Sequence, residues 1–349
     1  MSFYNFMSSA ANASLNRGPK PVGGWVELGR SSGSSQLDVS SLDDKRYYMV
    51  LLSEPSGNIA FSYYLNTDSG SNYSRRYSND GGSPDGTDIS QTSLFGSGLT
   101  FGDYNQFMVS YISNLSGNEK LGITHIASGQ TTGASNAPSR WEGVSKWANT
   151  SNAINRIQTE GTMTDSNSEM VVLGWDPDDT HTNNFWEELA SDSPTGSAGE
   201  SMDVSFTAKK YLWVQWYIDA DSPYSFSQMR VGNSSVDTGS NYATRYSING
   251  ATDGTGTSAD KWDLNASTLG AGEQEFGNMF IINNASNEKL MMCWIGGNNT
   301  GAGAANAPHR SEWTGKWDNT SNQIDTIQML TNGSDTKTSK SFIKVWGAD

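Results

Sequence analysis

The sequence contains few of the residues on which redox and acid-base chemistry most often depend. Its 349 residues include one cysteine, Cys293, and three histidines. A single cysteine excludes an intrachain disulfide framework, so we expect burial of apolar side chains to hold the fold together. No second cysteine and no nearby histidine accompany Cys293. It is therefore interpreted as a small buried hydrophobe and not as a reactive thiol.

Basic residues are also scarce. The chain has 22 Lys and Arg against 37 Asp and Glu, which gives a formal net charge of -15. Phosphate backbones and anionic membrane surfaces are bound by clustered Lys and Arg, so nucleic acid and membranes are not expected as partners. No apolar run is long enough to span a bilayer. The first residues lack the pattern of a secretory signal, so we expect the chain to fold in a cytoplasm.

What the sequence does have is an internal repeat. The string SNAPSRWEGVSKWANTSNAI at 135–154 returns as ANAPHRSEWTGKWDNTSNQI at 305–324, with twelve of twenty positions identical, and DSGSNYSRRYS at 68–78 returns as DTGSNYATRYS at 237–247. A nearly constant spacing over so long a stretch indicates one duplicated domain. We place an N-terminal arm at 1–24, repeat one at 25–178, a linker at 179–185 and repeat two at 186–349.

The local patterns within each repeat are those of β-strands. Segments such as YYMVLLS (47–53), FMVSYIS (107–113) and MVVLGW (170–175) are short, rich in aromatic and β-branched residues, and separated by Gly, Asn, Asp and Ser. Few segments show an apolar period of 3.6 residues. The sequence predicts an all-β chain of two tandem homologous β-sandwich domains, of jelly-roll or concanavalin-like type, with an extended N-terminal arm.

The arm has no counterpart before repeat two. It is polar apart from a few aromatic residues, among them Phe3, Tyr4 and Phe6. One interpretation is a disordered terminus, as is common at chain ends. The other is an arm whose aromatic tip inserts into a neighbouring subunit and folds on binding.

No catalytic constellation is recognisable. His125 aligns with Trp294 in the other repeat, and His309 aligns with Ser139. The third histidine, His181, lies in the linker. The sequence has no GxSxG, HExxH, Walker-type or CxxC motif. We therefore expect a protein that is not an enzyme and binds no cofactor.

Four aspartates lie in Gly- and Asn-rich loops that recur between the repeats, namely Asp68, Asp85, Asp237 and Asp253. Oxygen ligands on such loops suit calcium, but their spacing matches no closed ligand set. The preferred interpretation is that they cap turns through hydrogen bonds to the backbone.

Twelve tryptophans supply the flat aromatic faces that carbohydrate recognition uses. Those shared by both repeats are assigned to common packing. Trp213, Trp262 and Trp294 are specific to repeat two and are the candidate glycan contacts. Core filling is the competing interpretation for each of them.

The repeated string reads as an amphipathic strand. Alternation places its charged residues on one face and its indoles on the other, because successive side chains of a strand point to opposite sides. A row of this kind is usually solvated, and its functional alternative is a subunit interface in which alternating charges fix the register. The charged candidates are Arg140, Glu142, Lys146, Arg310, Glu312 and Lys316.

A resemblance to a known family rests on WVELGR (25–30), SGSNYSRRYSNDGG (69–82), NAPSR (136–140), KWANTSNAINRI (146–157) and VVLGWD (171–176). Together these resemble the repeated units of virion structural proteins of marine tailed bacteriophages. The resemblance covers both repeats, and it departs where SFIKVWGAD ends repeat two. It supplies no catalytic residue.

The resemblance and the composition lead to one expectation and two alternatives. We expect a non-enzymatic phage virion protein that decorates or stabilises the capsid or tail as a homo-oligomer, in contact with other virion proteins. The alternatives are a lectin-like module that recognises a glycan on the host surface and a double jelly-roll capsid subunit.

Overall fold

The computed structural model describes residues 24–57, 61–95, 104–177, 184–221, 227–264, 269–298, 303–331 and 336–349. Within these ranges the chain is built of antiparallel strands and turns, and no helix occurs. The all-β prediction is thus confirmed. Among the described residues no helix could cross a bilayer. The candidate arm residues Phe3, Tyr4 and Phe6, and most of the linker with His181, lie outside the described ranges.

Repeat one forms two sheets. The large sheet has the strand order β1-β11-β3-β7-β8-β9-β5-β6, and the small sheet has the order β2-β10-β4. The strands are β1 (Val26–Ser32), β2 (Asp38–Ser40), β3 (Tyr47–Gly57), β4 (Tyr63–Leu65), β5 (Tyr73–Asn79), β6 (Gly86–Gln91), β7 (Tyr104–Ser113), β8 (Lys120–Ser128), β9 (Ser139–Trp147), β10 (Arg156–Thr159) and β11 (Glu169–Trp175).

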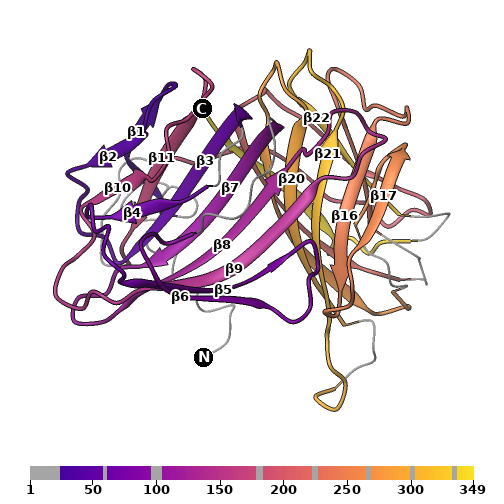
Figure 1. The fold of residues 1–349 in the computed structure, drawn as a ribbon. Coiled ribbons are helices and arrows are strands. Elements are labelled where there is room, and N and C mark those ends of the chain that lie inside the picture. The colour runs from indigo at the N-terminus through magenta and orange to yellow at the C-terminus, as the bar shows by residue number, and fades with distance from the viewer. Residues whose placement is uncertain are drawn as a thin grey trace, which may run out of the picture.

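Repeat two has the same plan. Its large sheet has the order β12-β23-β14-β19-β20-β21-β16-β17, and its small sheet has the order β13-β22-β15-β18. The strands are β12 (Glu187–Asp192), β13 (Met202–Ser205), β14 (Tyr211–Asp219), β15 (Ser227–Gly232), β16 (Tyr242–Ile248), β17 (Gly254–Ala259), β18 (Trp262–Asp263), β19 (Gln274–Ile282), β20 (Lys289–Gly297), β21 (His309–Trp317), β22 (Thr326–Thr331) and β23 (Phe342–Ala348). Figure 1 shows the two β-sandwiches, repeat one in indigo to magenta and repeat two in rose through orange to yellow.

Each repeat encloses its own core between its large and small sheets. In repeat one, Val50 and Leu52 of β3 point into this core. In repeat two the corresponding strand, β14, contributes Val214 and Trp216. The arrangement follows from strand parity, since alternate residues of a strand line the same face.

A third core lies between the two repeats. Met49 and Leu51 point away from the core of repeat one and pack, with Phe107, against Tyr211 and Phe280 of repeat two. The central strands of both large sheets are therefore buried on both faces. This explains why segments such as 47–53 are almost continuously apolar instead of alternating. We call this interface between the two large sheets the joint.

The repeated strings hold a tryptophan in the same place in both sandwiches. The indole N–H of Trp147 donates to the carboxylate of Asp68 at 2.7 Å, and that of Trp317 donates to Asp237 at 2.8 Å. Asp68 also accepts the backbone N–H of Gly70 at 2.9 Å. Although burial by itself raises it, the pKa of Asp68 is lowered by these donated hydrogen bonds.

The same string continues into a turn that is also shared. The side-chain oxygen of Asn149 accepts the N–H groups of Ser151 and Asn152, both at 2.9 Å, and Asn319 does the same in repeat two. Asp68 and Asn149 thus cap turns through local hydrogen bonds, as the sequence interpretation preferred. The string is a structural element of each sandwich.

Candidate interaction surfaces

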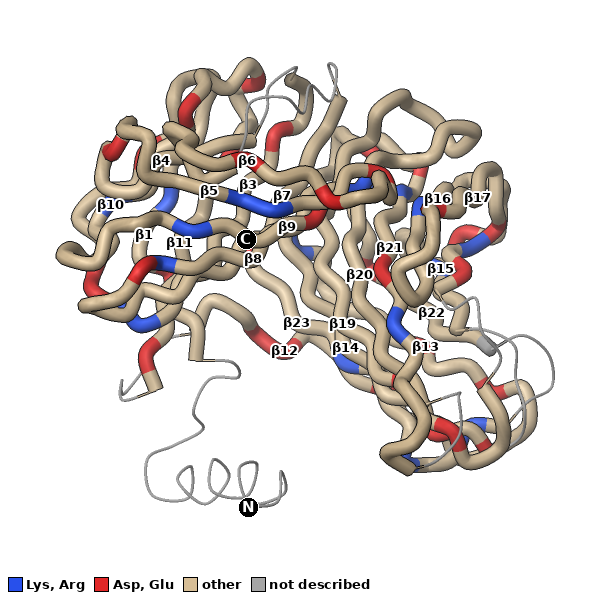
Figure 2. The backbone as a smooth tube through the Cα atoms, turned by 60° about the horizontal axis from the view of Figure 1, so that its bottom comes forward, with Lys and Arg blue, Asp and Glu red and all other residues tan. Residues whose placement is uncertain are grey.

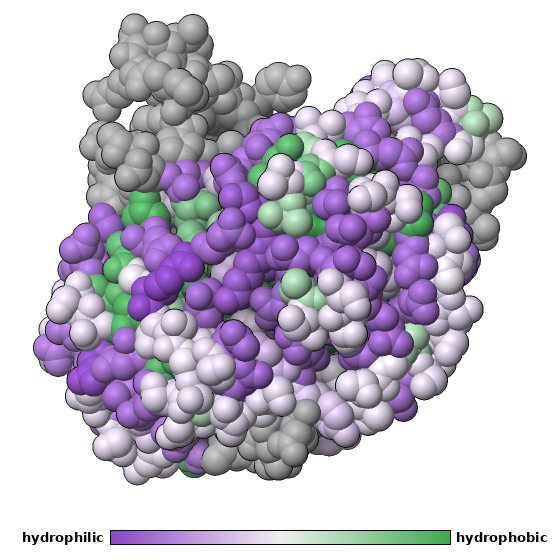
Figure 3. Space-filling model, turned by 90° about the horizontal axis from the view of Figure 1, so that it is seen from above, coloured by the Kyte–Doolittle hydropathy of each residue, from purple (hydrophilic) through white to green (hydrophobic). Residues whose placement is uncertain are grey.

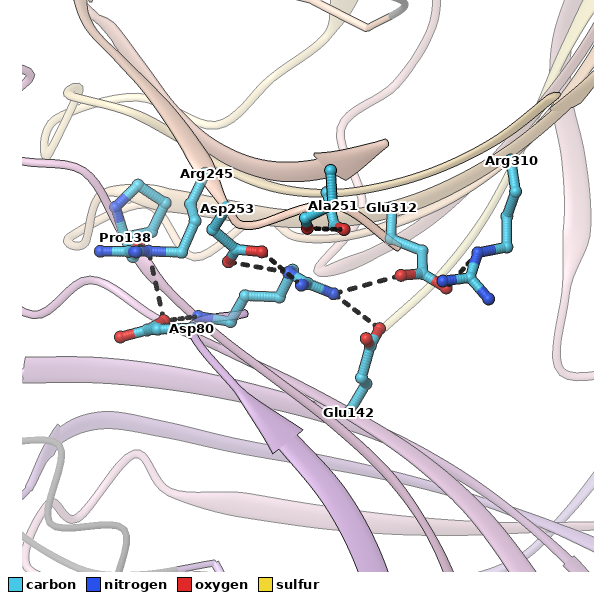
Figure 4. A network of polar contacts seen from close by, with 10 residues as sticks. Asp80, Pro138, Glu142, Arg245, Ala251, Asp253, Arg310 and Glu312 are labelled. Carbon is cyan, nitrogen blue, oxygen red and sulfur yellow. Dashed lines mark hydrogen bonds and ion pairs between the residues drawn. The ribbon is translucent and has the colours of Figure 1, made fainter. Parts of the chain in front are cut away.

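A buried ion network crosses the joint, and Arg140 contacts three of its carboxylates. Figure 4 shows these partners, Asp253, Glu142 and Glu312. The guanidinium of Arg140 lies 2.6 Å from Asp253 of repeat two, 2.7 Å from Glu142 and 3.3 Å from Glu312. The Arg140 side chain is only 5% exposed and that of Asp253 only 2%. Hydrogen bonds between ionised groups are stronger than neutral ones, and low exposure strengthens them further. The network therefore fixes how the two repeats meet.

The environment of this network disfavours the ionised form of Glu312. Burial, together with the nearby charge of Glu142, raises the pKa of Glu312 to about 7. Burial opposes the charge on Arg140, but its hydrogen bond to Asp253 and the charge of Glu142 raise the pKa of its guanidinium above the usual value. The cluster holds more acidic than basic groups, so Glu312 binds a proton more readily than a solvated glutamate does.

A second polar cluster ties the loop after β8 to repeat two. Lys316 donates to the backbone carbonyls of Gly129 and Thr131 and lies 3.5 Å from Glu288. Glu288 accepts the N–H of Gly133 at 2.5 Å. Burial lowers the pKa of Lys316 and raises that of Glu288. Each group keeps a charged partner, which is how buried charges are accommodated.

The charged residues of the repeated strand thus lie in two different environments. Arg140 and Lys316 are buried inside the chain at the joint, so the expectation of a solvated row is wrong for these two residues, and neither is available to a second chain. Lys146 and Arg310 are exposed, with 46% and 61% of their side chains accessible. For the exposed pair a subunit interface stays a prediction. The indoles of the string do point inward, as parity predicted.

The three candidate glycan tryptophans are placed where packing needs them. Trp262 is 0% exposed in the core of repeat two. Trp213 and Trp294 pack against the core of the joint. Trp213 stacks on Phe280, with ring centroids 5.6 Å apart. The glycan assignment is wrong for Trp262, because a fully buried side chain cannot contact a sugar, and the other two fill the joint.

His125 and Cys293 also serve packing. His125 meets Trp294 across the joint with ring centroids 4.2 Å apart. Burial lowers the pKa of His125 to about 3, so it is neutral near neutral pH. Cys293 is buried, and burial raises the pKa of its thiol. Within the described ranges no group of three or more His, Cys, Asp and Glu residues is arranged to hold a metal ion.

The surface around the joint is mixed in character. Acidic and basic positions are interspersed over both sandwiches (Figure 2). On the face shown in Figure 3, hydrophobic residues reach the surface as patches among hydrophilic ones. These views agree with the acidic composition of the chain.

One exposed apolar groove stands out on repeat one. It has a volume of about 540 Å³ and runs over β5, β6, β8 and β9. Ile89, Leu121, Ile123 and Val144 line it and are 77%, 57%, 53% and 50% exposed. Sequence reasoning missed this groove. The available signal was that Leu121, Ile123 and Val144 are apolar at positions that parity assigns to the outer face.

Comparison with known proteins places the chain in no family. No family model and no curated protein matches it. Among solved structures, OccK9 (OpdG) of Pseudomonas aeruginosa aligns over 86% of this chain and 97% of its own, with 10% identity and a TM-score of 0.13. The outer membrane protein OprD of the same organism aligns over 89% and 97%, with 9% identity and a TM-score of 0.10. At such scores neither likeness carries an argument about fold or function.

Proposed function

We propose that the chain is a non-enzymatic structural protein of a phage particle that decorates or stabilises the capsid or tail as an oligomer. The observation that carries the proposal is the exposed apolar groove on the large sheet of repeat one. Four large apolar side chains, each at least half exposed, lie together there. Contiguous apolar surface on a folded chain marks a place where something else binds.

The build of the joint supports the same proposal. A third apolar core and the network around Arg140 hold the two sandwiches together. Domains that move relative to one another usually meet through smaller and more polar interfaces. A pair of sandwiches fixed in this way is suited to serve as a rigid building block in an assembly.

The resemblance to repeated virion proteins is the reason why we propose a phage particle as the assembly. The charge and the turn-rich β architecture are compatible with a protein that folds in a bacterial cytoplasm and then joins a particle. The N-terminal arm is the segment we assign to attachment, with Phe3, Tyr4 and Phe6 as its contacts.

The proposal is tested on intact particles of the phage that encodes this sequence. Mass spectrometry of purified virions is expected to detect the chain in a fixed copy number, and imaging is expected to locate it on the capsid or tail. Absence of the chain from purified, infectious particles would overturn the proposal. Deletion of residues 1–24 is expected to abolish attachment while both sandwiches stay folded, and undiminished attachment would refute the role of the arm alone.

A further inference from the structure

The joint between the repeats is not a two-fold interface. A two-fold axis would bury homologous residues equally in both repeats. Instead, Met292 of repeat two is 1% exposed at the joint, whereas its homologue Ile123 is 53% exposed. Conversely, Phe107 of repeat one is 1% exposed, and its homologue Phe276 is 49% exposed. One end of the large sheet of repeat one packs on the opposite end of the large sheet of repeat two. Each repeat therefore uses one of two possible contact surfaces in the joint, and its other surface, the unused half, is left uncovered within the chain.

The unused half on repeat one has the chemistry of the used half on repeat two. In the joint, repeat two contributes Arg245, Asp253, Ser258, Leu290 and Lys316. The homologous positions of repeat one carry the same residue types, and all of them are exposed. We call this surface the socket, and its members are Arg76, Asp85, Ser90, Leu121 and Lys146.

Backbone geometry agrees with this correspondence. The N–H of Ser258 donates across the joint to the carbonyl of Ala134 at 2.7 Å. Ser258 has a φ of 49°, and Ser90 in the socket has a φ of 52°. Few non-glycine residues adopt this left-handed conformation, so the shared conformation shows that the local backbone is preserved in the socket.

In the loop before β21, the unused half on repeat two matches the used half on repeat one, although on the strands Gln215 and Asn278 replace Leu51 and Val109. In the joint, repeat one contributes the loop that contains Ala134 and Pro138, followed by Arg140, and these three residues are buried. The homologous loop of repeat two reads NAPHR in place of NAPSR, and its side chains are largely exposed. We call this surface the plug, and its members are Phe276, Ala304, Pro308 and Arg310.

Most of the large apolar side chains that are exposed among the described residues lie at these two surfaces. Tyr47, Leu121, Ile123 and Val144 are exposed at or beside the socket, whereas their homologues in repeat two are at most 2% exposed. The homologues are Tyr211, Leu290, Met292 and Thr314. The joint therefore shows what covers such a face in this protein, namely the plug-type end of another copy of the same domain.

We propose that copies of the chain join head to tail, with the plug of one copy seated in the socket of the next. Arg310 of one copy then pairs with Asp85 of the next, as Arg140 pairs with Asp253 inside the chain. Repetition of one heterologous contact generates a ring or a filament. The inference names the oligomer contact of the proposed function and rests on that function only for its biological setting.

The test uses the full chain and two variants that each disable one surface. Ile123→Asp places a charge in the socket, and Arg310→Glu reverses the charge of the plug. Sedimentation velocity from about 1 to 100 μM is expected to show large assemblies for the unaltered chain and monomers for each variant alone. Ser40→Asp, on the small sheet of repeat one, is the control and is expected to assemble normally.

Mixing the two variants distinguishes this specific contact from nonspecific association. The intact plug of Ile123→Asp meets the intact socket of Arg310→Glu, so the mixture is expected to form dimers and nothing larger. Monomers in the mixture, or an unaltered chain that stays monomeric throughout, would overturn the inference. If Ile123→Asp fails to fold, Leu121→Lys takes its place.

The two proposals fail separately. A chain that assembles in solution but is absent from particles would overturn the proposed function alone. A chain that is present in particles but shows no plug-and-socket contact would overturn the inference alone.

Discussion

Replacing Arg140 with methionine tests whether the buried ion network holds the joint together. The substitution keeps much of the aliphatic side chain but removes the basic group that contacts Asp253, Glu142 and Glu312 together. Three carboxylates then remain with little access to water, because their side chains are 2%, 21% and 14% exposed. Methionine can fill the volume of the removed group but cannot balance their charge.

The expected loss is large for a single substitution. Removal of one partner from a buried ion pair typically destabilises a protein by about 3 to 5 kcal/mol, because the remaining charge is uncompensated. The loss is expected to be smaller at pH 5.5 than at pH 8.5. Since the pKa of Glu312 is about 7, this group is mostly protonated at the lower pH and adds less negative charge to the cluster.

The measurement combines urea denaturation with amide hydrogen exchange at the joint. A loss of about 3 kcal/mol corresponds to roughly 100-fold faster exchange of the Ser258 N–H that donates to Ala134. Arg310→Met is the matched comparison, since the homologous arginine is 61% exposed and contacts one carboxylate of the network, Glu312, at 3.4 Å, and a loss of at most about 1 kcal/mol is expected for it. Equal effects of the two substitutions would refute the inference that the ion network around Arg140 holds the two repeats together.

Three further predictions concern other polar and aromatic groups. The pKa of His125 is lowered to about 3 by burial, so its contribution to stability is complete above about pH 6.5 and is lost as the pH falls toward 3. His125→Phe should therefore keep about 1 to 3 kcal/mol more stability than the unaltered chain at pH 4 and none extra at pH 8, as measured by urea midpoints; identical pH profiles would contradict this. Asp68→Ala and Asp237→Ala each remove the acceptor of a tryptophan N–H and of a turn N–H, and thermal melting should show similar losses of about 1 to 3 kcal/mol in both, whereas a neutral result in one repeat would refute a shared role. Trp262→Ala should destabilise repeat two by about 3 to 5 kcal/mol, and a variant with an unchanged melting temperature but lost binding on a glycan array would restore the lectin alternative.

Much of the fold could be read from the sequence. Strand patterns and turn residues predict an all-β chain, and the recurrence of 135–154 as 305–324 predicts that one domain occurs twice. Strand parity accounts for the positions of Trp213 and Trp216 on opposite faces of one strand, with Trp216 in the core of repeat two and Trp213 at the joint. These properties depend on the alternation of side chains along a strand and on identity between distant segments, and both can be recognised in a sequence.

The candidate sites were predicted less well. The sequence indicated charged and aromatic residues of interest, but it did not show that Trp262 lies in a core or that Arg140 lies between two sandwiches. A period of two assigns a residue to one of two faces and does not say what covers that face. Only the approach of residues far apart in the sequence, such as Arg140 and Asp253, decides this.

The contrast between homologous residues makes the division clear. The sequence by itself determined the β class, the duplication, the absence of an intrachain disulfide framework and the turn residues that follow Trp147 and Trp317 in both repeats. The tertiary structure decided that Arg140 is buried while Arg310 is exposed. Nearly identical local sequence places both arginines on corresponding strands, β9 and β21, and on the same face of their sheets. Their environments differ because the two repeats meet head to tail, so only one of the two copies of each surface is covered within the chain.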